Sequence, residues 1–192
     1  MTDKERFIEI YNKYIHREGA DELLGWLNKS DMFTAPASTR FHLSVEGGLC
    51  QHSLHVYDRL IQLYEMEFGK IEESDPIMES IAISSLLHDL CKVNFYTVSL
   101  RNSKNEETGK WEKLPYYSVS EKLNYGGHGS KSVFLVERFM KLKIEEAIAI
   151  NCHMGSWDIA PGDYSVGNAF SNCKLALLTH MADEFASFVD EV

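Results

Sequence analysis

The pair His88-Asp89 places an imidazole beside a carboxylate at the end of an apolar stretch. His52 follows a glycine-rich segment that leads into another apolar stretch, and Asp183 lies in a third, late in the chain. A mixture of imidazole nitrogen and carboxylate oxygen is typical of a site for manganese, iron, nickel, cobalt or zinc, whereas magnesium and calcium prefer mostly oxygen. These four residues therefore predict a site for a divalent transition metal ion.

Two further histidines predict a second metal ion beside the first. His128 follows two glycines at the start of a helical pattern, and His153 ends another such pattern. Asp89 has two carboxylate oxygens and could bridge the ions, at the separation of roughly 3.5–4 Å that is used in phosphate-ester hydrolysis. Water held between such ions is acidified and becomes the nucleophile. The sequence thus predicts one or two divalent transition metal ions and hydrolysis that depends on them.

Side chains near the predicted ligands suggest further roles. Lys92 follows Asp89 by about one helical turn and could direct its ammonium group at a phosphate oxygen, which would stabilise charge in the transition state. The alternative, which we favour less, is a solvated lysine that complements the helix dipole. His55 and His180 each lie one turn from a predicted ligand, and we favour packing or support of that ligand over coordination. His42, in a loop, could contact the substrate.

Helical periodicity covers most of the chain and must position these residues. Apolar residues recur at steps of three and four in the predicted helices, which span residues 4–17, 21–30, 46–68, 74–89, 128–140, 144–152 and 169–189. We expect a loop with glycine and proline at 155–167. The helix at 74–89 is apolar over most of its circumference, so it is predicted to lie at the centre of the fold. With 192 residues, 44% of them hydrophobic, the chain suits one well-filled core, and residues 1–192 are expected to form a single all-α domain.

A β-hairpin is predicted as an insertion directly after the His-Asp pair, at about residues 94–119. This segment opens with β-branched and aromatic residues, continues through polar, turn-forming residues and ends in a second strand-like stretch. Tyr96 and Trp111 could stack on a base, and Arg101 and Lys113 could bind phosphate. The alternative is that the aromatic residues only pack the hairpin against the helices.

The formal net charge of −10 limits the partners that the chain is expected to bind. An extended grip on DNA or RNA depends on many Lys and Arg side chains that neutralise phosphates, so extended nucleic acid is disfavoured. A small anionic ligand remains compatible, because a bound metal cation can reverse the local potential. We therefore expect a small phosphorylated substrate. No pattern in the chain predicts its oligomeric state.

The N-terminus and the cysteines indicate a compartment. Residues 1–6 carry charges of both signs with no apolar stretch behind them, unlike a signal peptide. No apolar run approaches the ~20 residues that span a bilayer, so a cytoplasmic protein without a membrane partner is expected. The 4 cysteines form no C-x-x-C pair and are predicted to be free thiols. A zinc–thiolate site is disfavoured, because structural zinc sites prefer closely paired cysteines.

The order of these motifs resembles the HD-domain metal-dependent phosphohydrolase superfamily, whose signature is H…HD…D on an all-helical bundle. The resemblance extends from about Pro36 to Asp183. It looks most like the HD domains of 3′-to-5′ exoribonucleases, on the motifs P-A, G-G-L-C-Q-H, H-D-L-C-K, G-H and H-M-G. Cys91 stands where that pattern has glycine, and Met154 where it has a second histidine. We expect the Cys91 change to affect packing more than chemistry.

This resemblance implies an HD-domain helical bundle whose metal ligands are His52, His88, Asp89, Asp183 and, for a second ion, His128 and His153. It also implies a phosphohydrolase, whether phosphatase, phosphodiesterase or nucleotidohydrolase. The nucleic-acid-binding domain that accompanies the exoribonucleases has no counterpart in the chain, so a nucleotide or related small phosphate monoester or diester is the favoured substrate. Two alternatives stay open: a non-catalytic HD-type module that senses or binds a nucleotide or anion, and a nuclease for single-stranded RNA or DNA.

Overall fold

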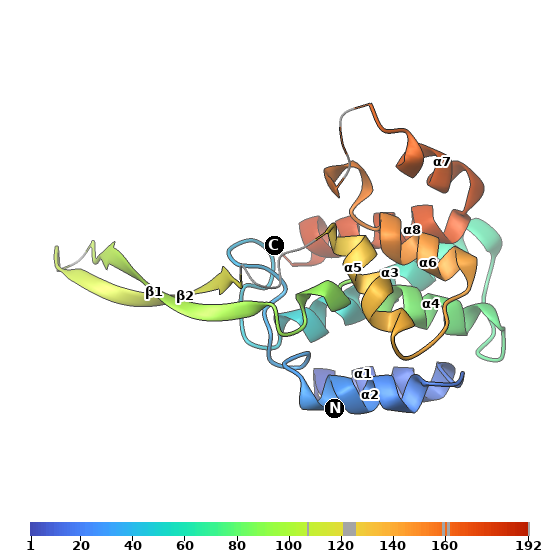
Figure 1. Cartoon of the computed structure of the whole chain (residues 1–192), viewed down its shortest axis with the longest axis horizontal. Helices are drawn as coiled ribbons and strands as arrows, with labels where there is room; N and C mark the ends of the chain where they lie inside the picture. Colours follow the sequence, from blue (N-terminus) through green and yellow to red (C-terminus); the bar gives the residue numbers. More distant parts are fainter. Residues whose placement is uncertain (107, 121–125, 159, 161, 192) are drawn as a thin grey trace.

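The computed structural model describes residues 1–106, 108–120, 126–158, 160 and 162–191. A helical body carries a long β-hairpin that projects from one side (Figure 1). The helices are α1 (Asp3–Tyr14), α2 (Ala20–Lys29), α3 (Gly48–Phe68), α4 (Ile77–Leu86), α5 (His128–Glu137), α6 (Ile144–Cys152), α7 (Ser165–Asn172) and α8 (Lys174–Phe185). The strands are β1 (Tyr96–Lys104) and β2 (Trp111–Val119), and the shorter helical turns are η1 (Leu90–Lys92), η3 (Gly155–Asp158) and η4 (Ala186–Asp190). The prediction of a mostly helical bundle with a hairpin inserted after the His-Asp pair is confirmed at this level.

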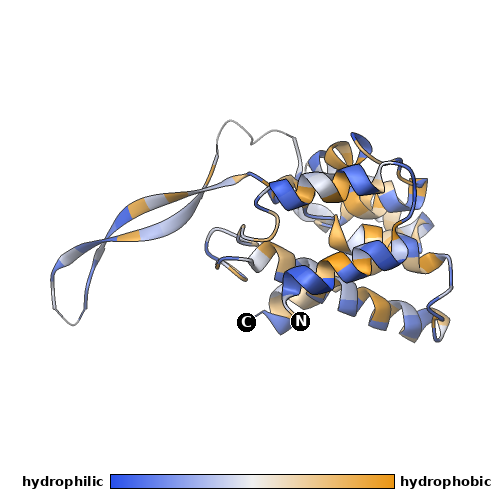
Figure 2. Ribbon diagram, turned by 90° about the horizontal axis from the view of Figure 1, so that it is seen from below, coloured by the Kyte–Doolittle hydropathy of each residue, from blue (hydrophilic) through white to orange (hydrophobic). Residues whose placement is uncertain are grey.

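Helix α4 lies at the centre of the body, as its apolar sequence predicted. Nearly all of its side chains are buried, and it contacts α1, α3, α6 and α8. Its buried residues include Ile81, Ile83 and Leu86. The burial of each of these side chains stabilises the fold by roughly 1.5–3 kcal/mol. Figure 2 shows hydrophobic and hydrophilic residues alternating along the helices of the body, as amphipathic helices require. Among the described helices, none combines the length and the apolar character needed to cross a membrane.

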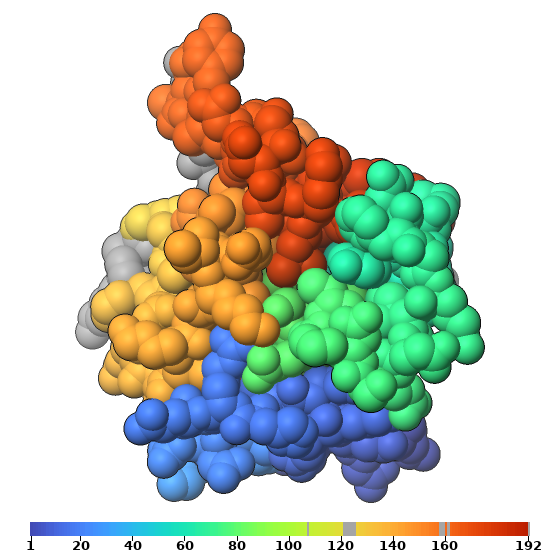
Figure 3. Space-filling model, turned by 90° about the vertical axis from the view of Figure 1, so that its right-hand side faces the viewer, coloured from blue at the N-terminus to red at the C-terminus, as the bar shows by residue number. Residues whose placement is uncertain are grey.

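A buried ionic network ties the N-terminal helices to this centre. The Arg17 guanidinium donates to Glu79 Oε2 on α4 and to Glu146 Oε2 on α6, both at 2.7 Å. Glu146 has no exposed side-chain surface and also accepts from Ser80 Oγ at 2.7 Å. Each buried charge therefore has the partners that it needs. Figure 3 shows the N-terminal part of the chain, in blue, packed along the bottom of the body.

The hairpin is exposed over most of its length. β1 and β2 pair antiparallel throughout, and at the base of the hairpin the Tyr96 hydroxyl donates to the carbonyl of Ala37 at 3.3 Å. Farther out, Val98, Leu100 and Trp111 are 67%, 62% and 71% exposed. Figures 1 and 2 both show the hairpin extending away from the helices. The outer part of the hairpin is therefore not packed against the body.

The C-terminal region is more divided than predicted. The stretch expected as one helix at 169–189 is interrupted at Cys173, whose backbone is extended with φ −127° and ψ 101°. Helix α7 also begins earlier, at Ser165, inside the predicted loop at 155–167. Asn172 Nδ2 donates to a carbonyl one turn earlier in α7 at 2.7 Å. Such contacts compete with the helical hydrogen bonds, and this favours the end of α7 at that point.

Candidate metal centre

His88 and Asp89 lie in a tight turn between α4 and η1 rather than inside a helix. Helix α4 ends at Leu86, and Asp89 adopts φ −102° and ψ 25° before η1 begins. Buried Ser85 donates through Oγ to the carbonyl of Ile81 at 2.7 Å, which competes with helical hydrogen bonds near this end. The turn directs both side chains into the body, where His88 is fully buried and Asp89 is 3% exposed.

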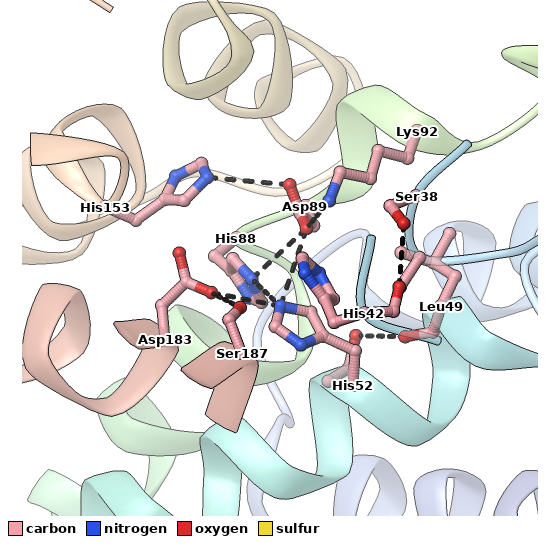
Figure 4. A network of polar contacts seen from close by, with 12 residues as sticks. Ser38, His42, Leu49, His52, His88, Asp89, Lys92, His153, Asp183 and Ser187 are labelled. Carbon is pink, nitrogen blue, oxygen red and sulfur yellow. Dashed lines mark hydrogen bonds and ion pairs between the residues drawn. The ribbon is translucent and has the colours of Figure 1, made fainter. Parts of the chain in front are cut away.

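Helices α3 and α8 bring His52 and Asp183 to the same place. His52 Nε2 lies 3.2 Å from His88 Nε2 and 3.1 Å from Asp183 Oδ1. Asp89 Oδ2 lies 3.5 Å from His88 Nε2 and 3.7 Å from His52 Nε2. Figure 4 shows these side chains pointing toward one another from separate segments of the chain. The structure thus brings together the four residues predicted as ligands of the first ion.

His153 approaches the other oxygen of Asp89, and His128 lies near the same carboxylate. His153 Nε2 is 3.5 Å from Asp89 Oδ1, and a ring nitrogen of His128 lies within 4.8 Å of an Asp89 oxygen. These histidines come from α5 and from the end of α6, and the two helices approach closely at Gly129, where a Cβ atom would lie 2.1 Å from the carbonyl oxygen of Asn151. Asp89 Oδ2 faces one pair of histidines and Oδ1 faces His153, which is the arrangement that a bridging carboxylate requires.

Hydrogen bonds behind the rings decide which nitrogen faces the cluster. The Nδ1–H of His88 donates to the carbonyl of Ser85, and that of His153 donates to the carbonyl of Ile150, both at 2.7 Å. Because a carbonyl can only accept, these bonds assign a proton to Nδ1 and leave Nε2 as a lone pair in the neutral ring. Support of this kind is typical of metal-binding histidines. His180 adds to it, because its Nδ1–H donates to the carbonyl of His153 at 2.6 Å.

Glu191, which the sequence did not single out, supports His52 from behind. Its side chain is buried, and its carboxylate accepts from His52 Nδ1 at 3.1 Å and from His55 Nδ1 at 2.8 Å. Burial alone would raise the pKa of Glu191, but the two histidines lower it to about 2. The next residue back, Asp190, pairs with Arg59 and so helps to hold the end of η4 against α3. An acidic residue after the last helix is normally solvated, which is why the sequence carried no signal for it.

The charges within this cluster shift one another's pKa values. Burial alone would lower the pKa of His52, but hydrogen bonds to Asp183 and Glu191 raise it to about 9. Burial alone would raise the pKa of Asp89, but Lys92 and the surrounding histidines hold it well below its usual value. The pKa of Asp183 is likewise lowered, against the effect of burial, by its hydrogen bond to His52. Both carboxylates are therefore ionised at neutral pH.

The cluster of His52, His88, Asp89, His153 and Asp183 fits a cation. Neutral His52 and His88 would direct lone pairs at each other across 3.2 Å, with two carboxylates beside them. His153 Nε2 is buried and makes no hydrogen bond within the described part of the chain. A shared positive charge, either a metal ion or added protons, is needed to offset this repulsion. Imidazole nitrogen with carboxylate oxygen is the ligand set of a transition metal.

No protein-family model, curated protein or solved structure matches this chain. Among the described residues, several groups of three have ligand atoms that all lie within 4.8 Å of one another. One group is His52, His88 and Asp183. Another, which shares His88 with the first, is His88, Asp89 and His153. All five side chains are buried, so this group of residues could hold a metal ion.

Lys92 belongs to the cluster and not to the solvated surface. Its Nζ lies 2.6 Å from Asp89 Oδ2, and the residue is 7% exposed. Burial alone would lower the pKa of Lys92, but Asp89 raises it above its usual value, so the side chain is charged. This burial argues against the alternative interpretation of Lys92 as a solvated lysine at a helix end. Lys92 instead supplies a fixed positive charge beside the carboxylate of the proposed bridge.

A cavity of about 710 Å³ opens onto the cluster. Asp89, Lys92, His128 and Asp183 are among its lining residues. The rim includes three aromatic side chains from three separate segments. Phe41 is 71% exposed, Trp157 is 78% exposed and Phe188 is 66% exposed. The cavity therefore combines ionised groups with exposed aromatic surface.

His42 lines the same cavity, as its predicted contact with substrate requires. Its ring centroid lies 4.9 Å from that of His52, and Ser38 Oγ holds the loop by donating to the carbonyl of His42 at 2.8 Å. Burial, together with the nearby charges of His52 and Lys92, lowers the pKa of His42 to about 4. The ring is therefore neutral at physiological pH and can exchange a hydrogen bond with a ligand.

The hairpin residues predicted to bind substrate are not brought together at the cluster. Tyr96 lies at the base of the hairpin, half-buried near Lys92. Arg101 lines a separate hollow of about 850 Å³, which shares Phe41 with the cavity. Trp111 and Lys113 lie on the part of β2 next to the hairpin turn and are exposed. Their contact with substrate stays a prediction.

Proposed function

We propose that this protein is an HD-domain metal-dependent phosphohydrolase that cleaves a phosphate monoester or diester of a nucleotide or related small molecule. One observation carries the proposal: the Nε2 atoms of three buried histidines converge on two ionised carboxylates, in His52, His88, His153, Asp89 and Asp183. These residues occupy the places of the H…HD…D motif and of its second-metal extension. A buried group with this much unshared electron density needs a shared positive charge, and its ligand set of imidazole nitrogen and carboxylate oxygen favours a transition metal ion as the source.

The ligands divide between two ions. The first would be held by His52, His88 and Asp183 and the second by His128 and His153, with one oxygen of Asp89 directed to each. When bound, such ions acidify a water molecule for attack on phosphorus and neutralise the charge of the phosphate. The division follows from the two faces of the Asp89 carboxylate, since Oδ2 lies 3.5 Å from His88 and Oδ1 lies 3.5 Å from His153.

The protein's own groups would orient the substrate and stabilise its charge. Lys92 Nζ lines the cavity and can donate to a phosphate oxygen, where a fixed positive charge contributes most as negative charge develops. His42, neutral and half-buried beside the cluster, can donate to or accept from a second polar atom of the substrate. Lys92 is attached to the buried turn η1, so its position costs little reorganisation during the reaction.

The cavity favours a small substrate with a ring system. Its volume of about 710 Å³ lies within the range of roughly 300–1,000 Å³ that is usual for small-molecule sites. Phe41, Trp157 and Phe188 at its rim are exposed and could stack on a nucleobase. The formal net charge of −10 argues against a nucleic-acid polymer in the same place.

The proposal is tested by hydrolysis assays on protein supplied in turn with manganese, iron, nickel, cobalt and zinc. The substrates are a broad panel of nucleotides and small phosphodiesters. We expect wild-type protein to hydrolyse at least one compound and Asp89→Asn to lose that activity. The matched control is Asp21→Asn, which removes an exposed carboxylate on α2 and should retain full activity. Circular dichroism checks that both variants are folded.

Three other outcomes separate the alternatives. Metal-bound protein that is inert toward the whole panel would contradict an enzymatic function. A nucleotide that binds tightly and is recovered unchanged would support the non-catalytic sensor or binding module instead. Cleavage of single-stranded RNA or DNA in preference to the small compounds would support the nuclease.

A further inference from the structure

Cys91 lies beside the bridging carboxylate, two residues beyond it in η1. The residue is 3% exposed, and its Sγ atom is 3.7 Å from Asp89 Oδ1. This is the same oxygen that lies 3.5 Å from His153 Nε2. Ligand atoms of Asp89, Cys91 and His128 all lie within 4.8 Å of one another. The thiol is therefore next to the position proposed for the second ion.

A buried hydrogen bond fixes this arrangement. The Cys91 backbone N–H donates to Ser132 Oγ on α5 at 3.0 Å, and Ser132 is fully buried. His128 precedes Ser132 by four residues on the same helix, so the two side chains share one face of α5. The bond therefore joins η1 to the face of α5 that carries His128. It holds the thiol and the imidazole at the same side of Asp89.

We propose that the Cys91 thiolate is a ligand of the second metal ion, with Asp89 Oδ1, His128 and His153, and that this position therefore selects zinc or a similar soft ion. The inference rests on the proposed metal centre and adds a ligand to it. Two nitrogens, one oxygen and one sulfur are a ligand set that zinc accepts readily in tetrahedral geometry. Manganese and magnesium are better suited by oxygen ligands, so a thiolate disfavours them here.

Cation binding also accounts for the ionisation that the thiol needs. A coordinating metal ion deprotonates a thiol outright. The S–H bond breaks as the metal–sulfur bond forms, and the proton passes to solvent. This reverses the expectation that Cys91 matters more for packing than for chemistry, since Asp89 and the histidines supply the ligands that paired cysteines supply elsewhere.

Cobalt substitution tests the inference without any substrate. Wild-type protein is titrated with Co²⁺ and its absorption spectrum is followed. We expect ligand-field bands in the visible region and, as the second ion binds, a thiolate-to-cobalt charge-transfer band in the near ultraviolet. Cys91→Ser should lose the charge-transfer band and keep the ligand-field bands of the first ion. The control Cys50→Ser changes a buried cysteine two residues before His52 and should keep both.

X-ray absorption of the zinc-bound wild type gives a second readout that needs no variant. A sulfur ligand adds a scatterer at ~2.3 Å, beyond the nitrogen and oxygen shell at ~2.0–2.2 Å. Ligand-field bands without a charge-transfer band, together with no sulfur shell, would overturn the role of Cys91 and leave the metal centre intact. Failure of the wild type to bind any of manganese, iron, nickel, cobalt and zinc would instead overturn the proposed function, and the two failures are thus distinct.

Discussion

The buried cluster of histidines and aspartates and the hairpin adjoin in the sequence but differ in burial. Lys92 in the cluster is 7% exposed, whereas Trp111 on the hairpin is 71% exposed. A buried polar group without a partner costs roughly 1–3 kcal/mol, so every histidine and aspartate in the cluster requires an explanation from its neighbours. An exposed side chain on the hairpin is solvated and requires none. Burial therefore makes the cluster strong evidence for function, while the hairpin supplies little.

Loss of the buried ammonium group should have the largest effect on catalysis. Lys92→Met is expected to lower kcat roughly 100- to 1,000-fold, because a fixed charge that stabilises the transition state is removed. Steady-state kinetics with the substrate found in the nucleotide panel measures the change. The hairpin counterpart Lys113→Met removes an exposed lysine and should lower kcat far less. Equal losses of kcat in the two variants would contradict the expected difference between the cluster and the hairpin.

The ionic network of Arg17, Glu79 and Glu146 should be sensitive to the loss of a charge, in the free energy of unfolding. Glu146→Gln is expected to destabilise the protein by about 3 kcal/mol, since the fully buried carboxylate of Glu146 and its ion pair with the half-buried Arg17 are lost. Chemical denaturation gives the free energy of unfolding. Glu112→Gln, on the hairpin, is the matched control and should change it little.

The cost of Glu146→Gln should also depend on pH. Burial alone would raise the pKa of Glu146, but Arg17 holds it below its ordinary value of 4.5. A carboxylate with a lowered folded pKa contributes stability that is present above the unfolded value and is lost as pH falls through the folded one. The difference in unfolding free energy between wild type and variant should therefore shrink as the pH is lowered below about 4.5. A difference that stays constant in acid would contradict the ion pair.

Loss of the carboxylate behind His52 should have an intermediate effect. Glu191→Gln keeps the shape of the side chain but weakens its support of His52, and metal affinity is expected to fall on the order of 10- to 100-fold. Competition with a chelator measures the affinity for zinc. Glu67→Gln is the control, because it changes an exposed carboxylate near the far end of α3. If the two variants bind zinc equally well, Glu191 does not position the ligand.

The smallest effect is expected at the far part of the hairpin. Trp111→Ala should change the free energy of unfolding by no more than ~0.5 kcal/mol, as is usual for an exposed site. Its kcat should equal that of the wild type. An increase in KM for the nucleotide substrate alone would confirm that the indole stacks on a base, and a large loss of stability would show that the hairpin is packed more tightly than its exposure indicates.

Much of the fold could be predicted because local patterns dominate it. The apolar face of α4, the turn residues of the hairpin and the bounds of α6 at 144–152 follow from spacing along the chain. The break at Cys173 could not be predicted in this way, because apolar residues continue across it in helical phase while the backbone becomes extended. The projection of the hairpin depends on what its base contacts and has no local pattern.

The cluster was predictable for a related reason. His52, His88 and His153 each stand near glycine or among apolar residues that bury them, which marks them as groups in need of a shared partner. The supporting carboxylate of Glu191 and the closeness of Cys91 depend on how η4 and η1 pack against α3 and α5. Contacts between distant segments of this kind are not encoded in the spacing of neighbouring residues.

Elemental analysis of protein purified without chelator tests the central claim most directly. The account predicts one or two transition metal ions per chain, and loss of bound metal when His88→Ala is prepared in the same way. The exposed-histidine variant His16→Ala should keep the wild-type content. Wild-type protein that holds no stoichiometric metal, even after exposure to manganese, iron, nickel, cobalt and zinc, would contradict the account.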